Sequence, residues 1–281
     1  MQPGIDPRIW SIARSVARSA MGHGALAVVL SGSHARGDAH AASDIDLIVV
    51  LAKRPSDSDR RGWLRPYRRR DGALVSLAWE TARSTQASFR DPRLAPVFVP
   101  GWREAMIIAD PPGVAARLQQ AARRWTWESI ADACDRWAAE HVTGLAEEVH
   151  KLAGTYARGQ RHVAAAQRSI LAVHLAAPIA VRRRILFGTD NALWDLVAER
   201  MGETWASVQA RALAEGGESF DESCRAALEL YALAAREVRP LLDAEQRAVV
   251  DGAIGEVAAR TRPASGGSAS GPAPRRPRRS R

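Results

Sequence analysis

Asp44 and Asp46, two aspartates separated by one residue, are the positions in this sequence best suited to chemistry. They stand at the start of an apolar run, residues 46–51, that is typical of a β-strand. Because side chains alternate between the two faces of a strand, both carboxylates are expected on the same face. Two carboxylates this close repel each other, and a divalent cation such as Mg²⁺ offsets that repulsion. The spacing therefore predicts a metal-binding pair.

Gly32 and Ser33 follow a second apolar run, residues 25–30, which is also predicted to be a strand. A glycine lets the backbone approach a phosphate closely, and the serine places a hydroxyl beside the same phosphate. Arg36 adds a positive charge in the loop that leads to the aspartates. A phosphate-binding loop followed by a metal-binding pair predicts a site for a nucleoside triphosphate and its metal.

The whole stretch, residues 32–49, resembles the signature of the polymerase β-type nucleotidyltransferase superfamily. That signature is Gly-Ser, about ten residues, and then Asp-apolar-Asp-apolar. Its fuller bacterial form, GSxARGxAxxxSDIDLIV, is matched here by GSHARGDAHAASDIDLIV. The resemblance implies that a nucleoside monophosphate, in the first instance AMP from ATP, passes to an acceptor hydroxyl with release of pyrophosphate.

The same resemblance implies roles for individual residues. Asp44 and Asp46 are the expected catalytic ligands of Mg²⁺, with two ions bound. The nucleotide-binding residues implied by the resemblance are Gly32, Ser33, Arg36 and Ser43. The family usually adds a third carboxylate on a later strand, but the position that aligns with it here is Ser76, and Glu80 at the end of that strand is a possible substitute.

A sheet domain followed by a helical one is similar to the antibiotic nucleotidyltransferases of the kanamycin type. This implies a small hydroxyl-bearing acceptor, such as an aminoglycoside-like compound, held by the helical domain. The runner-up acceptor is tRNA or a protein side chain, as in toxin-type relatives. A third hypothesis is a degenerate nucleotide-binding module without turnover, because Ser76 cannot act as a base at neutral pH.

Glu148 is the candidate general base from the helical part. Residues 130–156 carry apolar positions at helical spacing, and around one continuous helix Glu148 falls beside the packed face whereas Glu147 points to water. Kanamycin-type relatives supply a glutamate from the start of this region, which is what the resemblance implies for Glu148. An ion pair between Glu148 and Lys151 or His141 is the alternative.

The order of the helices and strands expected around these residues predicts an α+β fold. It consists of a small mixed sheet in a nucleotidyltransferase domain, followed by an all-helical bundle. A helix is expected over residues 7–21, and strands over 25–30, 46–51, 74–79 and 106–109. Beyond Gly113 only helix patterns occur. The expected units are residues 1–120, 121–258 and a disordered basic tail, 259–281.

Charge and composition add limits. The chain has 281 residues and a net charge of +9, but seven arginines and no acid lie in residues 260–281. The arginine-rich stretch 60–72 is interpreted as a solvated loop, with attraction of an anion as the alternative. No run approaches a membrane span and no signal pattern begins the chain, so a cytoplasmic protein without a membrane partner is expected. Cys134 and Cys224 are expected to be buried thiols.

Overall fold

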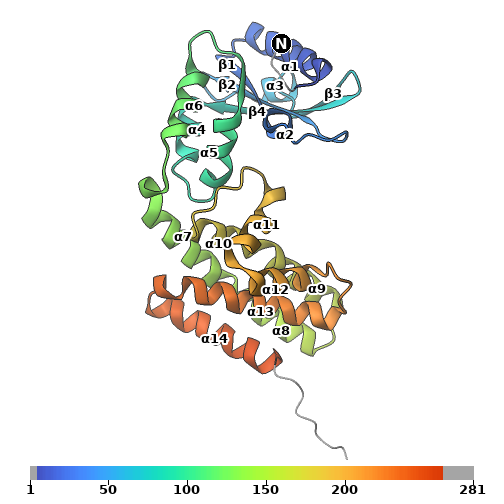
Figure 1. Ribbon diagram of the computed structural model, residues 1–281, viewed down its shortest axis with the longest axis vertical. Coiled ribbons are helices and arrows are strands. Elements are labelled where there is room, and N and C mark those ends of the chain that lie inside the picture. Colours follow the sequence, from blue (N-terminus) through green and yellow to red (C-terminus); the bar gives the residue numbers. More distant parts are fainter. Residues whose placement is uncertain (1–4, 262–281) are drawn as a thin grey trace, which may run out of the picture.

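The computed structural model describes residues 5–261, and the side chains of residues 5–259. A five-stranded mixed sheet with its helices forms the N-terminal part, and helices alone form the rest (Figure 1). This is the α+β class that the sequence predicts.

The sheet has the strand order β3-β4-β2-β1-β5. Strands β2 and β4 are parallel, and the other neighbouring pairs are antiparallel. The bounds are β1 Ala27–Ser31, β2 Ile45–Leu51, β3 Tyr67–Arg70, β4 Ala73–Thr81 and β5 Met106–Ala109. Four of these strands confirm the sequence prediction within a few residues.

Strand β3 was not predicted from the sequence. Its four residues, Tyr67–Arg70, lie within the arginine-rich stretch that was interpreted as a loop. Three of them are arginines, so the strand carries no apolar alternation that would mark it. It forms the edge of the sheet by pairing with β4, which follows it after the turn at Gly72.

Helices cover both faces of the sheet. Their bounds are α1 Pro7–Gly22, α2 Gly32–Arg36, α3 Asp57–Arg61, α4 Ala82–Ser88, α5 Ala95–Glu104 and α6 Val114–Arg124. Helix α1 begins as predicted, because the Asp6 side chain accepts a hydrogen bond from the Arg8 N–H at 2.7 Å. Its apolar side packs with Leu47 and Val75 of the sheet, whereas α5 and α6 pack with Val29 and Val50 on the opposite face.

The remaining helices form the C-terminal part. They are α7 Ala131–Gly144, α8 Ala146–Ala157, α9 Arg161–His174, α10 Ala176–Arg182, α11 Asp190–Met201, α12 Glu203–Leu213, α13 Phe220–Val238 and α14 Ala244–Thr261, with short 3₁₀ turns at Trp127–Ile130 and Arg239–Leu241. Residues 259–261, which were predicted to begin a disordered tail, end α14. Residues 262–281 of that predicted tail lie outside the described residues.

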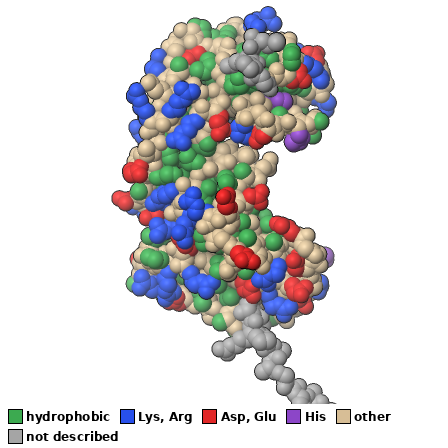
Figure 2. Space-filling model, viewed as in Figure 1, with side chains coloured by type: hydrophobic (Ala, Val, Ile, Leu, Met, Phe, Trp, Pro, Cys, Tyr) green, Lys and Arg blue, Asp and Glu red, His purple; other side chains and the backbone are tan. Residues whose placement is uncertain are grey.

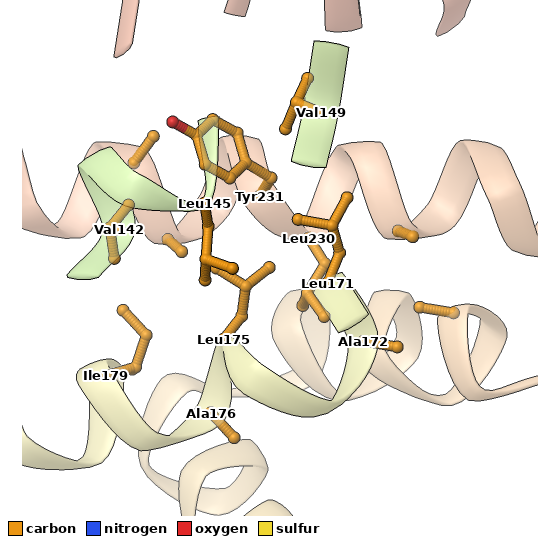
Figure 3. Packing of buried hydrophobic residues seen from close by; sticks show 14 of the residues in the cluster. Val142, Leu145, Val149, Leu171, Ala172, Leu175, Ala176, Ile179, Leu230 and Tyr231 are labelled. Atoms are coloured by element: carbon orange, nitrogen blue, oxygen red, sulfur yellow. The ribbon is translucent and has the colours of Figure 1, made fainter. Parts of the chain in front are cut away.

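The helical core shows why one prediction needs correction. Figure 3 shows Val142, Leu145 and Val149 packed with Tyr231 of α13, as the apolar spacing predicted. However, residues 130–156 are not one helix, because α7 ends at Gly144 and α8 begins at Ala146. The apolar face nevertheless continues from α7 to α8, because Leu145, which lies between the two helices, is buried.

One stretch of the described residues, Arg161–Arg182, is long and apolar enough to cross a membrane by length and composition alone. The sequence-based expectation that no run approaches a membrane span is therefore wrong by this criterion. The stretch comprises α9 and α10, and its residues Leu171, Leu175 and Ile179 belong to the helical core shown in Figure 3. Both cysteines are free and buried, as predicted.

The two parts are joined by a shared apolar cluster and by backbone hydrogen bonds. Cys134 of α7 and Val181 of α10 pack in the same cluster as α5, α6 and the sheet. The N–H groups of Phe187 and Gly188 both donate to the carbonyl of Pro96 in α5, each at 3.1 Å. The segment between α10 and α11 is therefore fixed against the N-terminal part.

Candidate active site

Asp46 is the second residue of β2, and Asp44 immediately precedes that strand. Asp46 is paired in register with Ser31 of β1 on one side and with Ser76 of β4 on the other. Tyr67 of β3 is paired with Ser76 in turn. Residues paired in this way share a face, so Ser31, Asp46, Ser76 and Tyr67 form one row across the sheet.

The electrostatics of Asp46 agree with the repulsion expected from the sequence. Burial, followed by the nearby charge of Asp44, raises the pKa of Asp46 to about 6. A hydrogen bond from the Ser76 hydroxyl and the positive charge of Arg36 oppose this rise in pKa without cancelling it. The pair is therefore a site where a bound cation would relieve an unfavourable charge.

Gly32 lies directly against the Asp46 side chain. Its φ is +67°, and a Cβ built there would stand 2.9 Å from the Asp46 Cγ, closer than real Cβ contacts. Only glycine fits this position, at the point where β1 ends and the short helix α2 begins. The first N–H groups of a helix have no intrahelical acceptor, and no side chain caps α2. These amides are thus available to phosphate oxygens beside the aspartate pair.

Arg36 is the last residue of α2, and Ser43 lies in the segment that connects α2 to β2. The Arg36 Nε donates to the Asp38 carboxylate at 3.1 Å, while its charge still acts on Asp46. The Ser43 hydroxyl accepts a hydrogen bond from the His40 N–H at 3.0 Å, which closes the loop just before Asp44. Ser43 thus has a structural contact of its own at the rim of the site.

A cleft of about 990 Å³ brings the predicted nucleotide and metal residues together with the helical part. Figure 2 shows the corresponding hollow between the two parts of the molecule. Its N-terminal wall carries Gly32, Ser33, Arg36, Ser43, Asp44 and Asp46. Its other wall comes from α5 and from the start of α11, where Asp190 and Asp195 line the cleft. The cleft therefore lies between the segment from Gly32 to Asp46 and a second wall that carries two acidic residues.

Glu148 is not brought to this site. It does not line the cleft, and α8 lies at the far end of the helical part in Figure 1. The Glu148 carboxylate pairs with the Lys151 ammonium at 3.1 Å, which is the alternative that the sequence analysis left open. Its side chain is 16% exposed against 70% for Glu147, as the helical spacing predicted. The helix position was correct, but the spatial relation to Asp46 was not, because periodicity along one helix carries no information about distant elements.

Glu80 does not replace the third carboxylate either. Its partner across the sheet is Val50, four residues along β2 from Asp46. The Glu80 carboxylate accepts a hydrogen bond from the Ser84 hydroxyl at 2.5 Å, and burial raises the pKa of Glu80. It therefore supports the start of α4. The position beside Asp46 is held by Ser76, as the alignment of the strand predicted.

Residues 18–87 match the family model described as nucleotidyltransferase domain. This part of the chain is therefore similar to a nucleotidyltransferase domain. That range includes β1, α2, β2, β3 and β4, and hence Gly32, Asp46 and Ser76. The prediction of a nucleotidyltransferase is confirmed at this level.

No curated protein matches the chain. Among solved structures it is similar to a nucleotidyltransferase-like protein from Exiguobacterium sibiricum 255-15. The two chains share 15% sequence identity with a TM-score of 0.45, over 91% of this chain and 81% of the other.

The donor set of the nucleotidyltransferase domain fits Mg²⁺ bound together with a triphosphate. Among the described residues, no group of three or more His, Cys, Asp or Glu side chains lies close enough to hold a metal ion. Mg²⁺ is commonly held by one or two carboxylates with substrate phosphates completing its shell. Asp44 and Asp46 would supply those carboxylates, and the amides at Gly32 would face the phosphates.

Asp190 and Asp195 line the cleft but were not predicted from the sequence as site residues. They stand more than 140 positions after Asp46 in the chain, in the first turns of α11, and carry no motif. Arg182, Arg183 and Arg184, at the end of α10 and just after it, form ion pairs with acids of α7 and α13. They hold the segment that leads to Asp190.

Proposed function

We propose that this protein transfers a nucleoside monophosphate from a Mg²⁺–nucleoside triphosphate, with ATP as the first candidate, to an acceptor hydroxyl. The single observation that carries the proposal is the contact between Gly32 and Asp46, which places a phosphate-binding turn and a metal-binding pair side by side. The cleft around them is large enough for a nucleotide.

On the nucleotide side, the start of α2 holds the β- and γ-phosphates. The N–H groups of Gly32 and Ser33 donate to phosphate oxygens, and Arg36 contributes a positive charge close to them. Asp44 and Asp46 hold the metal, which neutralises charge on the triphosphate when it is bound. These contacts fix the α-phosphorus near Asp46.

The reaction balances as a displacement at the α-phosphorus. The acceptor oxygen bonds to that phosphorus, and the bond from phosphorus to the bridging oxygen of the β-phosphate breaks. Pyrophosphate leaves, and the hydroxyl proton goes to water. Ser76 stands where the family usually has a third carboxylate, so positioning and charge neutralisation are the contributions this chain makes.

Two acceptor classes are each supported by an observation. Asp190 and Asp195 on the α11 wall favour a cationic small molecule of the aminoglycoside-like kind, because they present negative charge opposite the nucleotide site. The arginines around β3 favour a polyanionic acceptor such as tRNA. The two acceptor classes therefore differ in the surface they would contact, which is the α11 wall for a cation and the arginines around β3 for a polyanion.

The test measures both nucleotide binding and nucleotidyl transfer on the same set of variants. Calorimetric titration with Mg²⁺–ATP and transfer from α-³²P-labelled triphosphates are measured for wild type, Asp46→Asn and Asp38→Asn. Asp38 is the matched control, because it lines the same cleft but contacts Arg36. We expect Asp46→Asn alone to lose Mg²⁺-dependent binding and transfer. Equal losses in both variants, or no Mg²⁺–triphosphate binding by wild type, would refute the proposed function.

A further inference from the structure

A second cavity, of about 780 Å³, lies at the end of the sheet where β2 and β4 begin. Its walls come from the start of α1, from α2, from the loop of residues 37–43 and from the turn between β3 and β4. Figure 1 shows α1, α2 and β3 in this region of the N-terminal part. The loop separates this cavity, called the α1 cavity below, from the cleft, because His40, Ala42 and Ser43 line both.

Two arginines at the α1 cavity are anchored on consecutive residues of the β3–β4 turn. The Arg8 guanidinium of α1 donates a hydrogen bond to the carbonyl of Asp71. The Arg69 guanidinium of β3 donates to the carbonyl of Gly72 at 2.8 Å. Neither side chain has another hydrogen bond or an ion pair among residues 5–259. Because a guanidinium carries several N–H donors, most of the donors of both groups remain available to a ligand.

The lining of the α1 cavity is more basic than acidic. His34 of α2 and His40 of the loop line it together with the two arginines, and Asp6 is the one acid among the described residues of its lining. The Asp6 carboxylate is already engaged, because it accepts the Arg8 backbone N–H at the start of α1. The His40 Nδ1 accepts the Ala42 N–H at 3.1 Å, so the neutral ring carries its proton on Nε2 and can donate from there. The α1 cavity therefore offers mainly hydrogen-bond donors, which suit an anion.

Part of the same lining is apolar. Ile5 and Ile9 at the start of α1 and Leu74 of β4 all line the α1 cavity. Leu74 is 41% exposed, so a ligand that covers it would remove apolar surface from water. An inorganic anion would leave that surface exposed. The lining therefore favours an anion that also carries an apolar group.

We propose that the α1 cavity binds a small organic anion, whose phosphate or carboxylate group meets Arg8 and Arg69 while its apolar body covers Leu74. Guanidinium groups bind the oxygens of such anions through paired N–H donors, and these charge-assisted hydrogen bonds are stronger than neutral ones. Anchoring on the turn carbonyls lowers the side-chain entropy that the arginines lose when a ligand binds. The site lies outside the nucleotide cleft and does not depend on the proposed function.

The experiment uses the full chain and calorimetric titration in a chloride buffer, with phenyl phosphate, benzoate and inorganic phosphate as probes. Phenyl phosphate and benzoate distinguish the two anionic groups, and inorganic phosphate lacks the apolar body. We expect wild type to bind at least one of the two organic anions more tightly than inorganic phosphate. No binding of any probe up to about 10 mM, or tightest binding of inorganic phosphate, would overturn the inference.

The two arginines are tested by substitution with glutamine, whose amide can still donate to the turn carbonyl. Arg8→Gln and Arg69→Gln should each weaken binding of the organic anion about tenfold or more, because each removes a charge-assisted hydrogen bond. Arg14→Gln on α1 and Arg70→Gln on β3 are the matched controls, since both residues are exposed and neither lines the α1 cavity. The controls should stay within about twofold of wild type. Equal losses in all four variants would indicate only general attraction to a basic protein, and the inference would fail.

Leu74→Ala tests the apolar contact at an exposed position, where truncation leaves the core intact. It should weaken phenyl phosphate binding about 3- to 10-fold and leave binding of inorganic phosphate unchanged. Val163→Ala on α9 is the control at another exposed apolar position. Affinity for phenyl phosphate that is the same in Leu74→Ala and wild type would contradict an apolar body over Leu74.

The segment from Gly32 to Asp46 in the cleft is the competing place for an anion. Arg36→Gln distinguishes the two places, because Arg36 lines the cleft and does not line the α1 cavity. We expect Arg36→Gln to bind phenyl phosphate as wild type does. Binding lost in Arg36→Gln but retained in Arg8→Gln would place the anion in the cleft and overturn the inference. Phenyl phosphate binding through Arg8 by a protein that binds no Mg²⁺–triphosphate would support the inference and contradict the proposed function.

Discussion

Gly32 and Asp46 are in van der Waals contact across the β1–β2 pair, so that the space a side chain would need at position 32 is filled by the Asp46 carboxyl group. Thirteen residues lie between them in the sequence, and the antiparallel pairing of Ser31 with Asp46 brings them together. In the proposed function, this contact sets where a phosphate would lie relative to the proposed metal ligands Asp44 and Asp46.

Replacing Gly32 by alanine tests that contact. Gly32→Ala should lower the free energy of unfolding by about 1–3 kcal/mol, because of the positive φ and the displaced carboxylate, and should weaken Mg²⁺–ATP binding. Gly37→Ala is the matched control, since Gly37 also has a positive φ but nothing lies within 4 Å of its Cβ position. It should cost about 1 kcal/mol and leave ATP binding intact. Equal effects of both variants in urea unfolding and in calorimetric titration would argue against the contact.

Asp46 should make the metal-free protein less stable as pH rises. Its pKa is 3.8 in an unperturbed chain and about 6 in the folded protein, so the folded state binds more protons between these values. Protonation of Asp46 therefore gives its full contribution to the free energy of unfolding below pH 4, and this contribution is lost as pH rises through 6. At pH 7.5, Asp46→Asn should raise stability by about 1–2 kcal/mol, discounted because the side chain is only half-buried.

The measurement is thermal unfolding between pH 4 and 8, with and without Mg²⁺. Wild type should gain Tm on addition of Mg²⁺ at pH 7.5 and much less at pH 5, where a proton occupies Asp46. Asp46→Asn should gain little at either pH. A stability of Asp46→Asn that follows wild type over the whole range would contradict the raised pKa.

Ser76 offers a test by addition of a carboxylate. Ser76→Asp places a third acid next to Asp46 on the same face, which should strengthen Mg²⁺ binding about tenfold or more while destabilising the metal-free protein by about 1–3 kcal/mol. Ser76→Asn, of similar size but neutral, should do neither. Fluorescence titration with Mn²⁺ and urea unfolding measure the two effects. Stronger metal binding by Ser76→Asn would show that size rather than charge acts here.

Glu148 should be dispensable for the chemistry. Glu148→Gln removes one of the two carboxylates that contact Lys151, and Glu147 keeps its own contact with the same ammonium at 2.9 Å. The expected loss of stability is within about 1 kcal/mol, and Mg²⁺–ATP affinity should be unchanged. Nucleotidyl transfer by Glu148→Gln at less than a tenth of the wild-type rate would restore Glu148 as the base.

Local patterns in the sequence predicted most of the fold. Helix α1 and four of the five strands were expected from the spacing of apolar residues. The same holds for the shared face of Asp44 and Asp46, because alternation along a strand is a property of the backbone. Leu145 shows the limit, since the packed stripe was correct although a helix boundary falls there.

By itself, the sequence determined the motif from Gly32 to Asp46 and the sheet-then-helix order, because both depend on contacts within short stretches of chain. Tertiary structure decided that β3 pairs at the sheet edge and that α11 rather than α8 faces the cleft. Those relations arise from pairing and packing between residues far apart in the chain, and no local propensity encodes which distant partner is chosen.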